Sequence, residues 1–505
     1  MEKGKSESQK GESQKYKSGG EKSDKDLFNI SKKDNFSEWY VELVRRAKLM
    51  DQRSPVKGFD VVMPNAYAIW EKVQEFLNPE FKRIGARNAY FPLVIPESLL
   101  KEEAEHFEGF VPEVAWVTHG GNEKLGDRLA IRPTSETMIN YMFALWVRSY
   151  QDLPMMVNQW CSVVRWETKM TKPFIRGREF LWQEGHTCFA SPEEAAKNML
   201  DVLEIYRRLL EERLKIACFF VKRPEWDKFA GAVETVSLET LMPDGRVLQA
   251  GTAHNMGTNF STPFGISFLD EKNEKKSVFQ TTWGVSTRLL GALVMSHGDD
   301  KGLVLPFEFA PVQIVIIPIL FKDKEAIVLG KCREVESKLE QAGFSVTVDS
   351  SAKRPGEKHY YWELMGAPLR IEIGPRDIES KKVVVVSRIT SEKSQVSEAA
   401  LINEVEKAAI KLDNELLKAS GTHLIRNIRE AISVKDAEAI VNSGGVAKVP
   451  FCSVEKDGEK CDKELKEKIS AEVRGTLYPK SPKAEGKCIV CGKPAKEIVY
   501  VAKAY

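Results

Sequence analysis

The sequence has little cysteine and no long apolar run, and both absences exclude whole classes of protein. Eight cysteines among 505 residues are too few for the disulfide framework of a small secreted domain. No run of about 18 apolar residues occurs, so we expect no membrane-spanning helix. The first residues contain no apolar segment of a secretory signal, and we therefore expect a cytoplasmic protein.

The chain also lacks an excess of charge of either sign. Its 75 lysines and arginines oppose 73 aspartates and glutamates, which gives a formal net charge of +2. A polybasic protein of the histone kind is thereby excluded, but nucleic-acid binding is not, because a basic face can be local. At roughly 150 residues per domain, a chain of 505 residues predicts about three domains.

Changes of composition divide the chain into four predicted segments: 1–34, 35–305, 306–419 and 420–505. Residues 1–34 are rich in Lys, Glu and Ser and have almost nothing apolar to bury, so we expect them to be disordered. They are either a solvated extension or a tether for nucleic acid or a partner. Residues 35–305 mix helices and strands without a regular alternation, which is typical of an α+β domain around a largely antiparallel sheet.

Capping residues and apolar runs mark single elements within these segments. Ser191, Pro192 and Glu194 form a strong helix start, with a serine N-cap, a proline in the first turn and a glutamate that closes a capping box. Between residues 306 and 419, strands and helices alternate as in an α/β domain. The predicted strands span 312–317, 344–348, 369–373 and 383–389, and the predicted helices span 325–342, 357–365 and 396–418.

A cluster of arginines, a glutamate and a phenylalanine lies where two predicted strands meet a polar loop. Arg165 and Glu167 precede this loop, and Arg176, Gly177 and Phe180 follow it. Arginine offers a planar, permanently charged fork for phosphate groups, and an aromatic ring can stack on a base. The spacing resembles motif 2 of the class II aminoacyl-tRNA synthetases, in which ATP and an amino acid form an adenylate.

The resemblance implies a role for each residue of this cluster. Arg165 would hold the α-phosphate of ATP together with the carboxylate of the amino acid, and Arg176 would hold the γ-phosphate. Glu167 would face the adenine side, Phe180 would stack on the base, and Gly177 would lie against the nucleotide.

Two further segments resemble the remaining class II motifs. Residues 280–291 contain Trp-Gly-Val-Ser-Thr-Arg and resemble motif 3 in its prolyl-type form. There Arg288 would pair with the γ-phosphate and Ser286 would lie beside ATP. Residues 82–87, followed by Pro92, resemble motif 1, which builds the subunit interface of class II enzymes. The motif 1 resemblance implies a homodimer.

Several short segments narrow the resemblance to the prolyl-tRNA synthetases of the archaeal and eukaryotic type. They are residues 132–136, 158–161, 182–186, 229–231 and 249–254, and the match runs from about residue 36 to the end. The resemblance implies a proline–tRNA ligase with L-proline, ATP and tRNA(Pro) as substrates. It also implies a class II antiparallel-sheet catalytic domain, an α/β anticodon-binding domain and a small zinc-binding α+β domain.

The same resemblance implies a pocket for proline. Thr134 and Glu136 would accept hydrogen bonds from the secondary ammonium group, and Arg165 would bind the carboxylate. The walls and the closing residue around the small apolar ring would be Trp182, His186, Phe229 and His254.

In the implied reaction no protein side chain acts as a nucleophile. The proline carboxylate attacks the α-phosphorus of ATP, pyrophosphate leaves, and the 3′-terminal ribose of tRNA then attacks the prolyl-adenylate. Arg165, Arg176 and Arg288 would neutralise the charge together with Mg²⁺. Gln249 would lie near the Mg²⁺, and both Gln249 and Thr252 would contact ATP.

Four of the eight cysteines lie in the last segment. Cys488 and Cys491 form a Cys-x2-Cys knuckle, and Cys452 and Cys461 precede them in a Gly- and Lys-rich stretch. Four thiolates in a domain of this size suit a tetrahedral structural Zn²⁺, and the resembled family carries such a site. The alternative is four free thiols. The other cysteines are expected to be plain core residues.

Two features concern tRNA selection and proofreading. Arg354 and Lys358 stand where a polar loop enters a predicted helix, and they either contact the tRNA anticodon or form a solvated helix start. Only about 100 residues separate Trp182 from Trp283. We therefore expect no inserted editing domain of the kind that bacterial-type prolyl enzymes often carry there.

Two other interpretations compete with a proline–tRNA ligase. A catalytically silent relative would have lost Arg165, Arg288 or Glu136, and all three residues are present. A threonyl-type enzyme would need a catalytic zinc held by cysteine and histidine in its core, and no such set of residues lies near the motif 2 resemblance.

Overall fold

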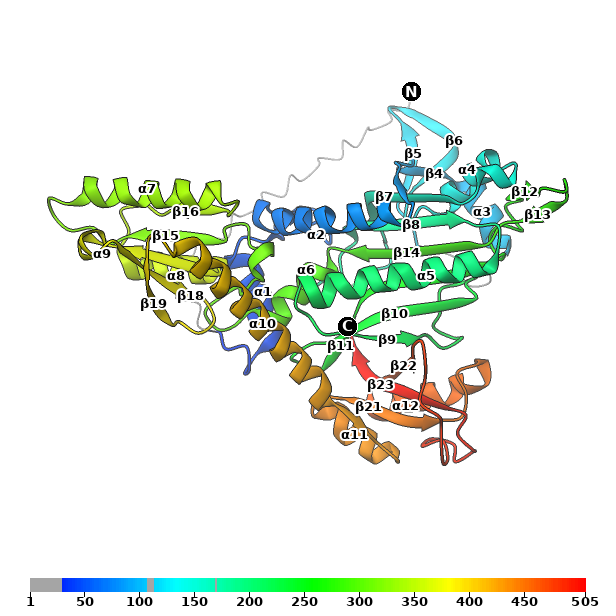
Figure 1. The fold of residues 1–505 in the computed structure, drawn as a ribbon. Helices are drawn as coiled ribbons and strands as arrows, with labels where there is room; N and C mark the ends of the chain where they lie inside the picture. Colours follow the sequence, from blue (N-terminus) through cyan, green and yellow to red (C-terminus); the bar gives the residue numbers. More distant parts are fainter. Residues whose placement is uncertain (1–29, 107–112, 169) are drawn as a thin grey trace, which may run out of the picture.

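The computed structural model describes residues 30–106, 113–168 and 170–505 (Figure 1). Its largest sheet has 11 strands in the order β20-β21-β23-β22-β9-β10-β11-β14-β8-β7-β3. From β9 to β7 all neighbours are antiparallel, as predicted, and β3 joins the edge in parallel. The strands of this half are β3 (Arg87–Asn88), β7 (Met155–Val164), β8 (Glu179–Cys188), β9 (Phe219–Lys222), β10 (Glu234–Leu241), β11 (Arg246–Gly257) and β14 (Gln280–Ser286).

Helices pack against the middle of this sheet (Figure 1). Helices α5 (Pro192–Arg207) and α6 (Arg288–His297) contact β11 and β14, and α1 (Phe36–Arg46) and α2 (Pro64–Arg83) pack against the helical layer. The predicted start of α5 is confirmed. The hydroxyl of Ser191 accepts a hydrogen bond from the backbone N–H of Glu194 at 3.3 Å, and the Glu194 carboxylate accepts one from the Ser191 N–H at 3.1 Å.

Smaller elements surround this core. Strands β4 (Val94–Pro96), β6 (Glu123–Ile131) and β5 (Trp116–Gly120) form a three-stranded sheet. The helices beside it are α3 (Glu97–His106) and α4 (Glu136–Trp146). Two hairpin-like pairs complete this part: β1 (Met50–Asp51) with β2 (Val61–Val62), and β12 (Ser267–Leu269) with β13 (Lys275–Ser277).

The next part is an α/β unit with the strand order β16-β15-β17-β18-β19. Its strands are β15 (Ile314–Pro318), β16 (Val346–Val348), β17 (Leu369–Ile373), β18 (Lys382–Ser387) and β19 (Lys393–Ser397), and its helices are α7 (Glu325–Gln341), α8 (Pro355–Met365), α9 (Pro375–Ser380) and α10 (Leu401–Asn427). The helix predicted for 396–418 is wrong at both ends. Val396 belongs to β19, where it pairs with Val383 of β18, and α10 continues past residue 419.

The C-terminal elements extend the central sheet and form no separate sheet. They are β20 (Ile428–Glu430), α11 (Val434–Asn442), β21 (Val446–Phe451), α12 (Glu459–Ile469), β22 (Glu472–Leu477) and β23 (Glu497–Ala504). Strand β22 pairs with β9, and the end of β23 lies parallel to β11 (Figure 1). A shared apolar cluster, including Phe219 and Tyr500, is buried at this junction. We call residues 428–505 the C-terminal unit.

Residues 30–34, at the end of the segment predicted to be disordered, belong to the described residues. Residues 1–29 of the predicted disordered segment lie outside the described residues, but Lys32 is anchored to the loop after α6. Its Nζ donates to the carbonyl of Gly298 at 2.6 Å, and its backbone N–H donates to Asp300 at 2.6 Å. Among the described helices, none combines the length and the apolar character needed to cross a membrane.

Candidate active site

Two adjoining cavities lie over the middle of the central sheet. The first, of about 290 Å³, is lined by residues of β8, β10, β11 and β14 and of the turn before α4. The second, of about 460 Å³, follows the loop between β7 and β8, and the two share Arg165, Phe180, Ser286 and Arg288. Small-ligand sites span roughly 300–1,000 Å³, so the pair can hold two substrates that meet at the shared residues.

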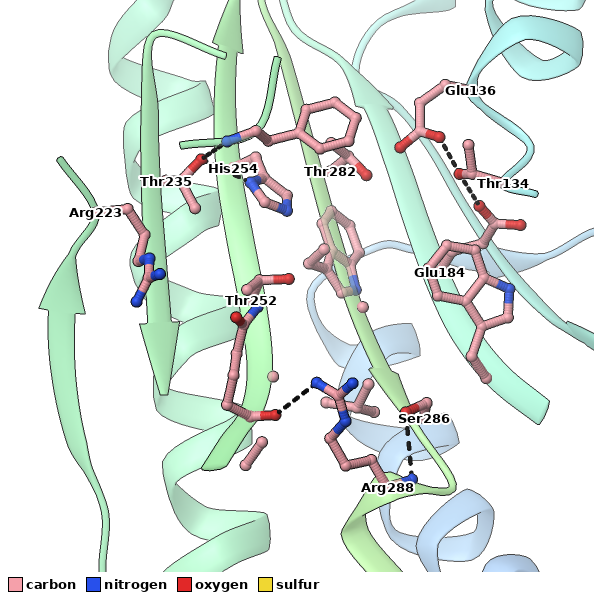
Figure 2. Close-up of a pocket in the computed structure, with 18 of the residues that line it drawn as sticks. Thr134, Glu136, Glu184, Arg223, Thr235, Thr252, His254, Thr282, Ser286 and Arg288 are labelled. Atoms are coloured by element: carbon pink, nitrogen blue, oxygen red, sulfur yellow. Dashed lines mark hydrogen bonds between the residues drawn. The ribbon is translucent and has the colours of Figure 1, made fainter. Parts of the chain in front are cut away.

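Two buried carboxylates line one end of the first cavity (Figure 2). Glu136, in the first turn of α4, is 6% exposed and accepts a hydrogen bond from the hydroxyl of Thr134. Glu184, on β8, is 1% exposed and accepts hydrogen bonds from the backbone N–H of Ser135 at 3.2 Å and from Gln159 Nε2 at 2.9 Å. Because buried carboxylates require compensation, this end of the cavity suits a cation that also donates hydrogen bonds.

His186 lies behind Glu184 and does not line the cavity, contrary to its predicted place in the pocket wall. Its side chain is buried, and its Nε2 lies 3.0 Å from Glu184 Oε2. His186 therefore supports the Glu184 carboxylate, which stands between the imidazole and the cavity.

The charges of this cluster depend on one another. Burial raises the pKa of Glu136; His186 opposes this rise and Glu184 adds to it. Burial also acts to raise the pKa of Glu184, but the hydrogen bond and the charge of His186 hold it below its usual value. Burial acts to lower the pKa of His186, but the hydrogen bond and the charge of Glu184, together with the charge of Glu136, raise it by more in sum, so the net shift is upward. His186 and Glu184 are thus a buried hydrogen-bonded pair that becomes an ion pair when the imidazole is protonated, and a bound ammonium group would favour the ionised form of the neighbouring Glu136.

The wall beside these carboxylates is aromatic and uncharged. The ring of Phe229 lies 4.9 Å from the ring of His254, measured between centroids. The hydroxyl of Thr235 accepts a hydrogen bond from the backbone N–H of Phe229 at 3.1 Å and lies 2.9 Å from His254 Nδ1. Burial lowers the pKa of His254 to about 3, so this ring is neutral near pH 7. Together with Trp182, which lines the same cavity, the wall suits a small apolar ring.

Three guanidinium groups line the second cavity, and two of them, Arg165 and Arg288, also line the first. Arg165 follows β7, Arg176 lies in the loop before β8, and Arg288 opens α6. Within the part of the chain that the structure describes, none of the three forms an ion pair with a carboxylate. Burial, and then the positive charges of Arg165 and Arg176, lower the pKa of Arg288 to about 10. Such mutual repulsion would be relieved by a bound polyanion such as a triphosphate.

Neutral contacts hold these arginines in place. Arg288 donates to the backbone carbonyls of Ile175 at 3.2 and 3.3 Å and of Gln249 at 3.4 Å. The guanidinium of Arg165 lies 5.3 Å from the ring centroid of Phe180 and 5.7 Å from that of Trp182. Arg165 and Arg288 are therefore oriented without a carboxylate partner among the described residues.

The other predicted nucleotide residues divide between the two cavities. Gln249 and Thr252 line the first cavity, and Glu167 and Gly177 line the second. A Cβ atom at Gly177 would lie only 2.9 Å from the backbone oxygen of Glu179. Glycine at this position therefore lets the loop pack closely before β8.

The two predicted anticodon residues have different surroundings. Arg354 is exposed at the start of α8. Lys358, in contrast, is 2% exposed, and its Nζ donates to the backbone carbonyl of Asp349 at 2.7 Å. The interpretation of Lys358 as an anticodon contact does not fit this placement, because the helix turns its side chain into the domain.

The four C-terminal cysteines come together although the sequence separates them. Their sulfur atoms all lie within 4.8 Å of one another, and the sulfurs of Cys452 and Cys461 are 3.7 Å apart. A tetrahedral zinc ion with Zn–S bonds of about 2.3 Å separates its sulfur ligands by about 3.8 Å. A disulfide would instead require about 2.05 Å. The geometry therefore fits a metal site with four cysteine ligands.

Several cavity residues were not predicted individually. Glu184 had a usable signal, because alternate residues of a strand share a face and Trp182 and His186 flank it at two-residue spacing. Arg223, Asp227 and Thr235 also line the cavity. These three come from β10 and from the loop before it, and their ordinary sequence context carried no functional signal.

Comparisons with known proteins agree over most of the chain. Residues 116–297 match the tRNA synthetase class II core domain (G, H, P, S and T), residues 313–408 match an anticodon binding domain, and residues 434–505 match the prolyl-tRNA synthetase C-terminal domain. The chain is 45% identical to a proline–tRNA ligase of Alkaliphilus oremlandii, over 93% of this chain and 96% of the relative. It is 44% identical to a proline–tRNA ligase of Cenarchaeum symbiosum, over 94% of this chain and 98% of the relative.

Proposed function

The chain belongs to the family of proline–tRNA ligases, and we propose that it activates L-proline with ATP and transfers the prolyl group to the 3′ end of tRNA(Pro). The observation that carries this proposal is the division of charge across the two joined cavities. Buried carboxylates lie at one end of the first cavity, and the second cavity is lined by three guanidiniums without carboxylate partners among the described residues, two of which also line the first. Proline offers an ammonium group to the buried carboxylates and a carboxylate group to the guanidiniums.

Proline would bind with its ring against the aromatic wall. Its secondary ammonium would donate to Glu136 and Thr134, with Glu184 supplying further negative charge from behind. Its carboxylate would pair with Arg165, which belongs to both cavities. The neutral His254 and the ring of Phe229 would exclude water from the pyrrolidine ring without adding a competing charge.

ATP would occupy the second cavity with its phosphates toward the arginines. Phe180 would stack on the adenine, Arg165 would hold the α-phosphate, and Arg176 and Arg288 would hold the γ-phosphate. The proline carboxylate oxygen attacks the α-phosphorus, the bond to the β-phosphate oxygen breaks, and pyrophosphate leaves with its electron pair. Positioning and prearranged positive charge lower the barrier of this step.

Class II synthetases usually use Mg²⁺ with ATP. Mg²⁺ takes oxygen ligands and is commonly held by one or two protein groups plus substrate phosphates. The side chain of Gln249, which lines the first cavity, could supply one such oxygen ligand. When bound, the ion would neutralise phosphate charge.

The remaining parts of the chain would serve the tRNA and the assembly. Arg354 remains the candidate for anticodon contact. We propose a homodimer through residues 82–92, because β3 is an edge strand and Tyr90 and Leu93 beside it are 71% and 43% exposed.

We also propose a cytoplasmic location, a structural zinc on the four cysteines, and no editing domain in cis. The interval from β8 to β14 contains α5, the central-sheet strands β9, β10 and β11, and the short β12–β13 pair.

Amino-acid-dependent ATP–pyrophosphate exchange tests the activation step. Purified protein should exchange with proline and not with threonine, because threonine presents a hydroxyl and a primary ammonium to a wall shaped for a ring. Exchange with threonine but not with proline would contradict the proposal, and so would the lack of exchange with any amino acid.

A further inference from the structure

The loop that carries Phe229 is held from behind by the C-terminal unit. It leaves β9 after Lys222 and reaches β10 at Glu234. The backbone N–H of Glu225 donates to the carbonyl of Val454 at 2.9 Å, and Trp226 packs against the apolar cluster of the C-terminal unit. The next three residues, 227–229, line the first cavity. One short loop thus contacts the C-terminal unit with one end and the amino-acid cavity with the other.

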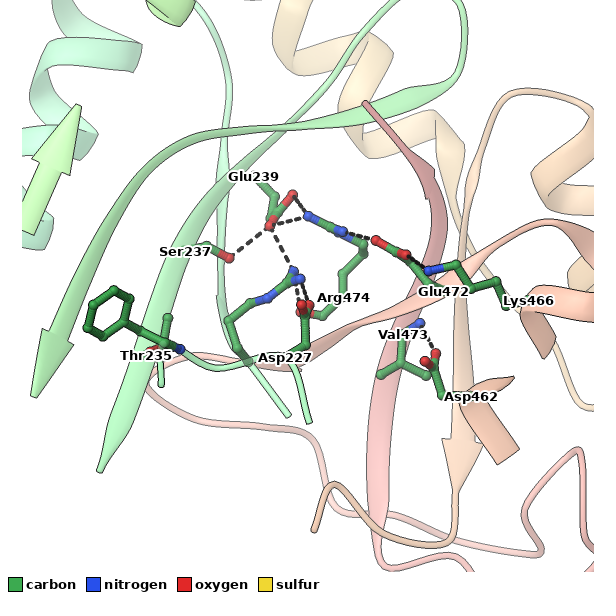
Figure 3. A network of polar contacts seen from close by, with 11 residues as sticks. Asp227, Thr235, Ser237, Glu239, Asp462, Lys466, Glu472, Val473 and Arg474 are labelled. Carbon is green, nitrogen blue, oxygen red and sulfur yellow. Dashed lines mark hydrogen bonds and ion pairs between the residues drawn. The ribbon is translucent and has the colours of Figure 1, made fainter. Parts of the chain in front are cut away.

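A buried ion network joins the same loop to β22 (Figure 3). Glu239, on β10, is completely buried, and Arg474 Nη2 donates to both of its carboxylate oxygens, at 3.0 and 3.1 Å. Arg223 Nη1 donates to the same carboxylate at 3.2 Å, and the other end of its guanidinium pairs with Asp227. The chain of contacts therefore runs from the C-terminal unit to a residue of the cavity wall.

This network is almost entirely shielded from solvent. Arg474 and Arg223 are 4% and 7% exposed, and Arg223 Nη1 also donates to the backbone carbonyl of Arg474 at 3.0 Å. A buried charge that loses its partner is costly. Loss of the Arg474 guanidinium would draw Arg223 toward Glu239 and away from Asp227. The loop would then lose its ionic anchor two residues before Phe229.

We propose that Arg474 and Trp226 are positioning residues of the amino-acid site, through which the C-terminal unit sets the placement of Phe229 against bound proline. Neither side chain lines the cavity, so both act through the loop of residues 223–233. The inference rests on the proposed function, since it concerns the binding of proline at that site.

Kinetics of proline-dependent ATP–pyrophosphate exchange separate positioning from general stability. Arg474→Met should raise KM for proline about tenfold and leave kcat within about twofold. A displaced cavity wall weakens the binding of proline but leaves the arginines that neutralise charge at the phosphorus in place. Arg474→Lys should raise KM less than Arg474→Met does, since lysine keeps the positive charge but loses the contact of the guanidinium with both oxygens of Glu239. The control is Lys466→Ala, which removes only an outer contact to Glu472 of 2.8 Å and should keep the wild-type KM.

Two further variants keep the test decisive if Arg474→Met folds poorly. Glu239→Gln combined with Arg474→Met leaves no unpaired carboxylate, and Trp226→Ala leaves the ion network intact, while Trp226→Phe should restore binding. Trp226→Ala should raise KM for proline. The double variant should raise it less than Arg474→Met alone, because a neutral amide at position 239 no longer draws Arg223 away from Asp227. An unchanged KM in both Arg474→Met and Trp226→Ala, with kcat reduced only in proportion to the folded fraction by circular dichroism, would overturn the inference. If the wild-type protein showed no proline-dependent ATP–pyrophosphate exchange, the proposed function itself would be overturned.

Discussion

Replacing Glu184 with glutamine removes the buried charge that organises the amino-acid end of the cavity. The carboxylate accepts hydrogen bonds from His186 at 3.0 Å, from Gln159 at 2.9 Å and from the Ser135 N–H at 3.2 Å. Glutamine keeps one acceptor oxygen and turns an NH₂ group toward the remaining donors. At least one buried donor is then left without a partner, and His186 loses its counter-charge.

The size of the effect follows from these contacts. A hydrogen bond to a charged group contributes about 1.5–3 kcal/mol, and an orphaned buried donor costs about 1–3 kcal/mol. Glu184→Gln should therefore lower the free energy of unfolding by about 3–5 kcal/mol, in the range for breaking a buried ion pair. It should also raise KM for proline in pyrophosphate exchange.

Urea denaturation measures the loss, and the same strand supplies a control. Glu179 opens β8 and is exposed, so Glu179→Gln should change the free energy of unfolding by less than about 0.5 kcal/mol. A loss below about 1 kcal/mol for Glu184→Gln would refute the interpretation of Glu184 as the charged centre of this cluster.

Three further predictions concern the nucleotide, the metal and the pH. Arg288→Ala should lower kcat/KM for ATP in pyrophosphate exchange about 100- to 1,000-fold, and a loss under about fivefold would speak against a phosphate contact. Elemental analysis should find about one zinc per chain, and chelation should destabilise the C-terminal unit; a metal-free and fully folded protein would refute the four-cysteine zinc site. Because the folded pKa of His186 is raised, its ion pair should stabilise fully below the unfolded pKa of about 6.5 and lose that contribution as pH rises through the folded pKa. His186→Asn should accordingly destabilise more at about pH 6 than at about pH 9.5, and an equal loss at both values would exclude a charged His186.

The fold could be predicted where a signal is local. The capping residues Ser191 and Glu194 and the strand at 369–373 needed only neighbouring sequence, and both are confirmed. The pairing of β22 with β9 joins residues far apart in the chain, and no local pattern specifies it. The sequence therefore predicts a separate domain over residues 420–505, and in the structure the strands of the C-terminal unit extend the central sheet.

The candidate site divides in the same way. Residues with a specific spacing, such as Arg165 and Arg288, could be identified from the sequence, and they line the cavities. Lys358 could not be judged, because a helix start gives no indication of which lysine turns inward. The contact between Arg474 and Glu239 depends on tertiary structure alone.

Aminoacylation with radiolabelled proline tests the central claim most directly, because it requires both half-reactions on the natural acceptor. The purified full chain should form prolyl-tRNA on a tRNA(Pro) transcript, and Arg165→Ala should abolish this product while circular dichroism remains that of the wild type. Failure of the folded, zinc-loaded wild-type protein to charge tRNA(Pro), or undiminished charging by Arg165→Ala, would contradict it.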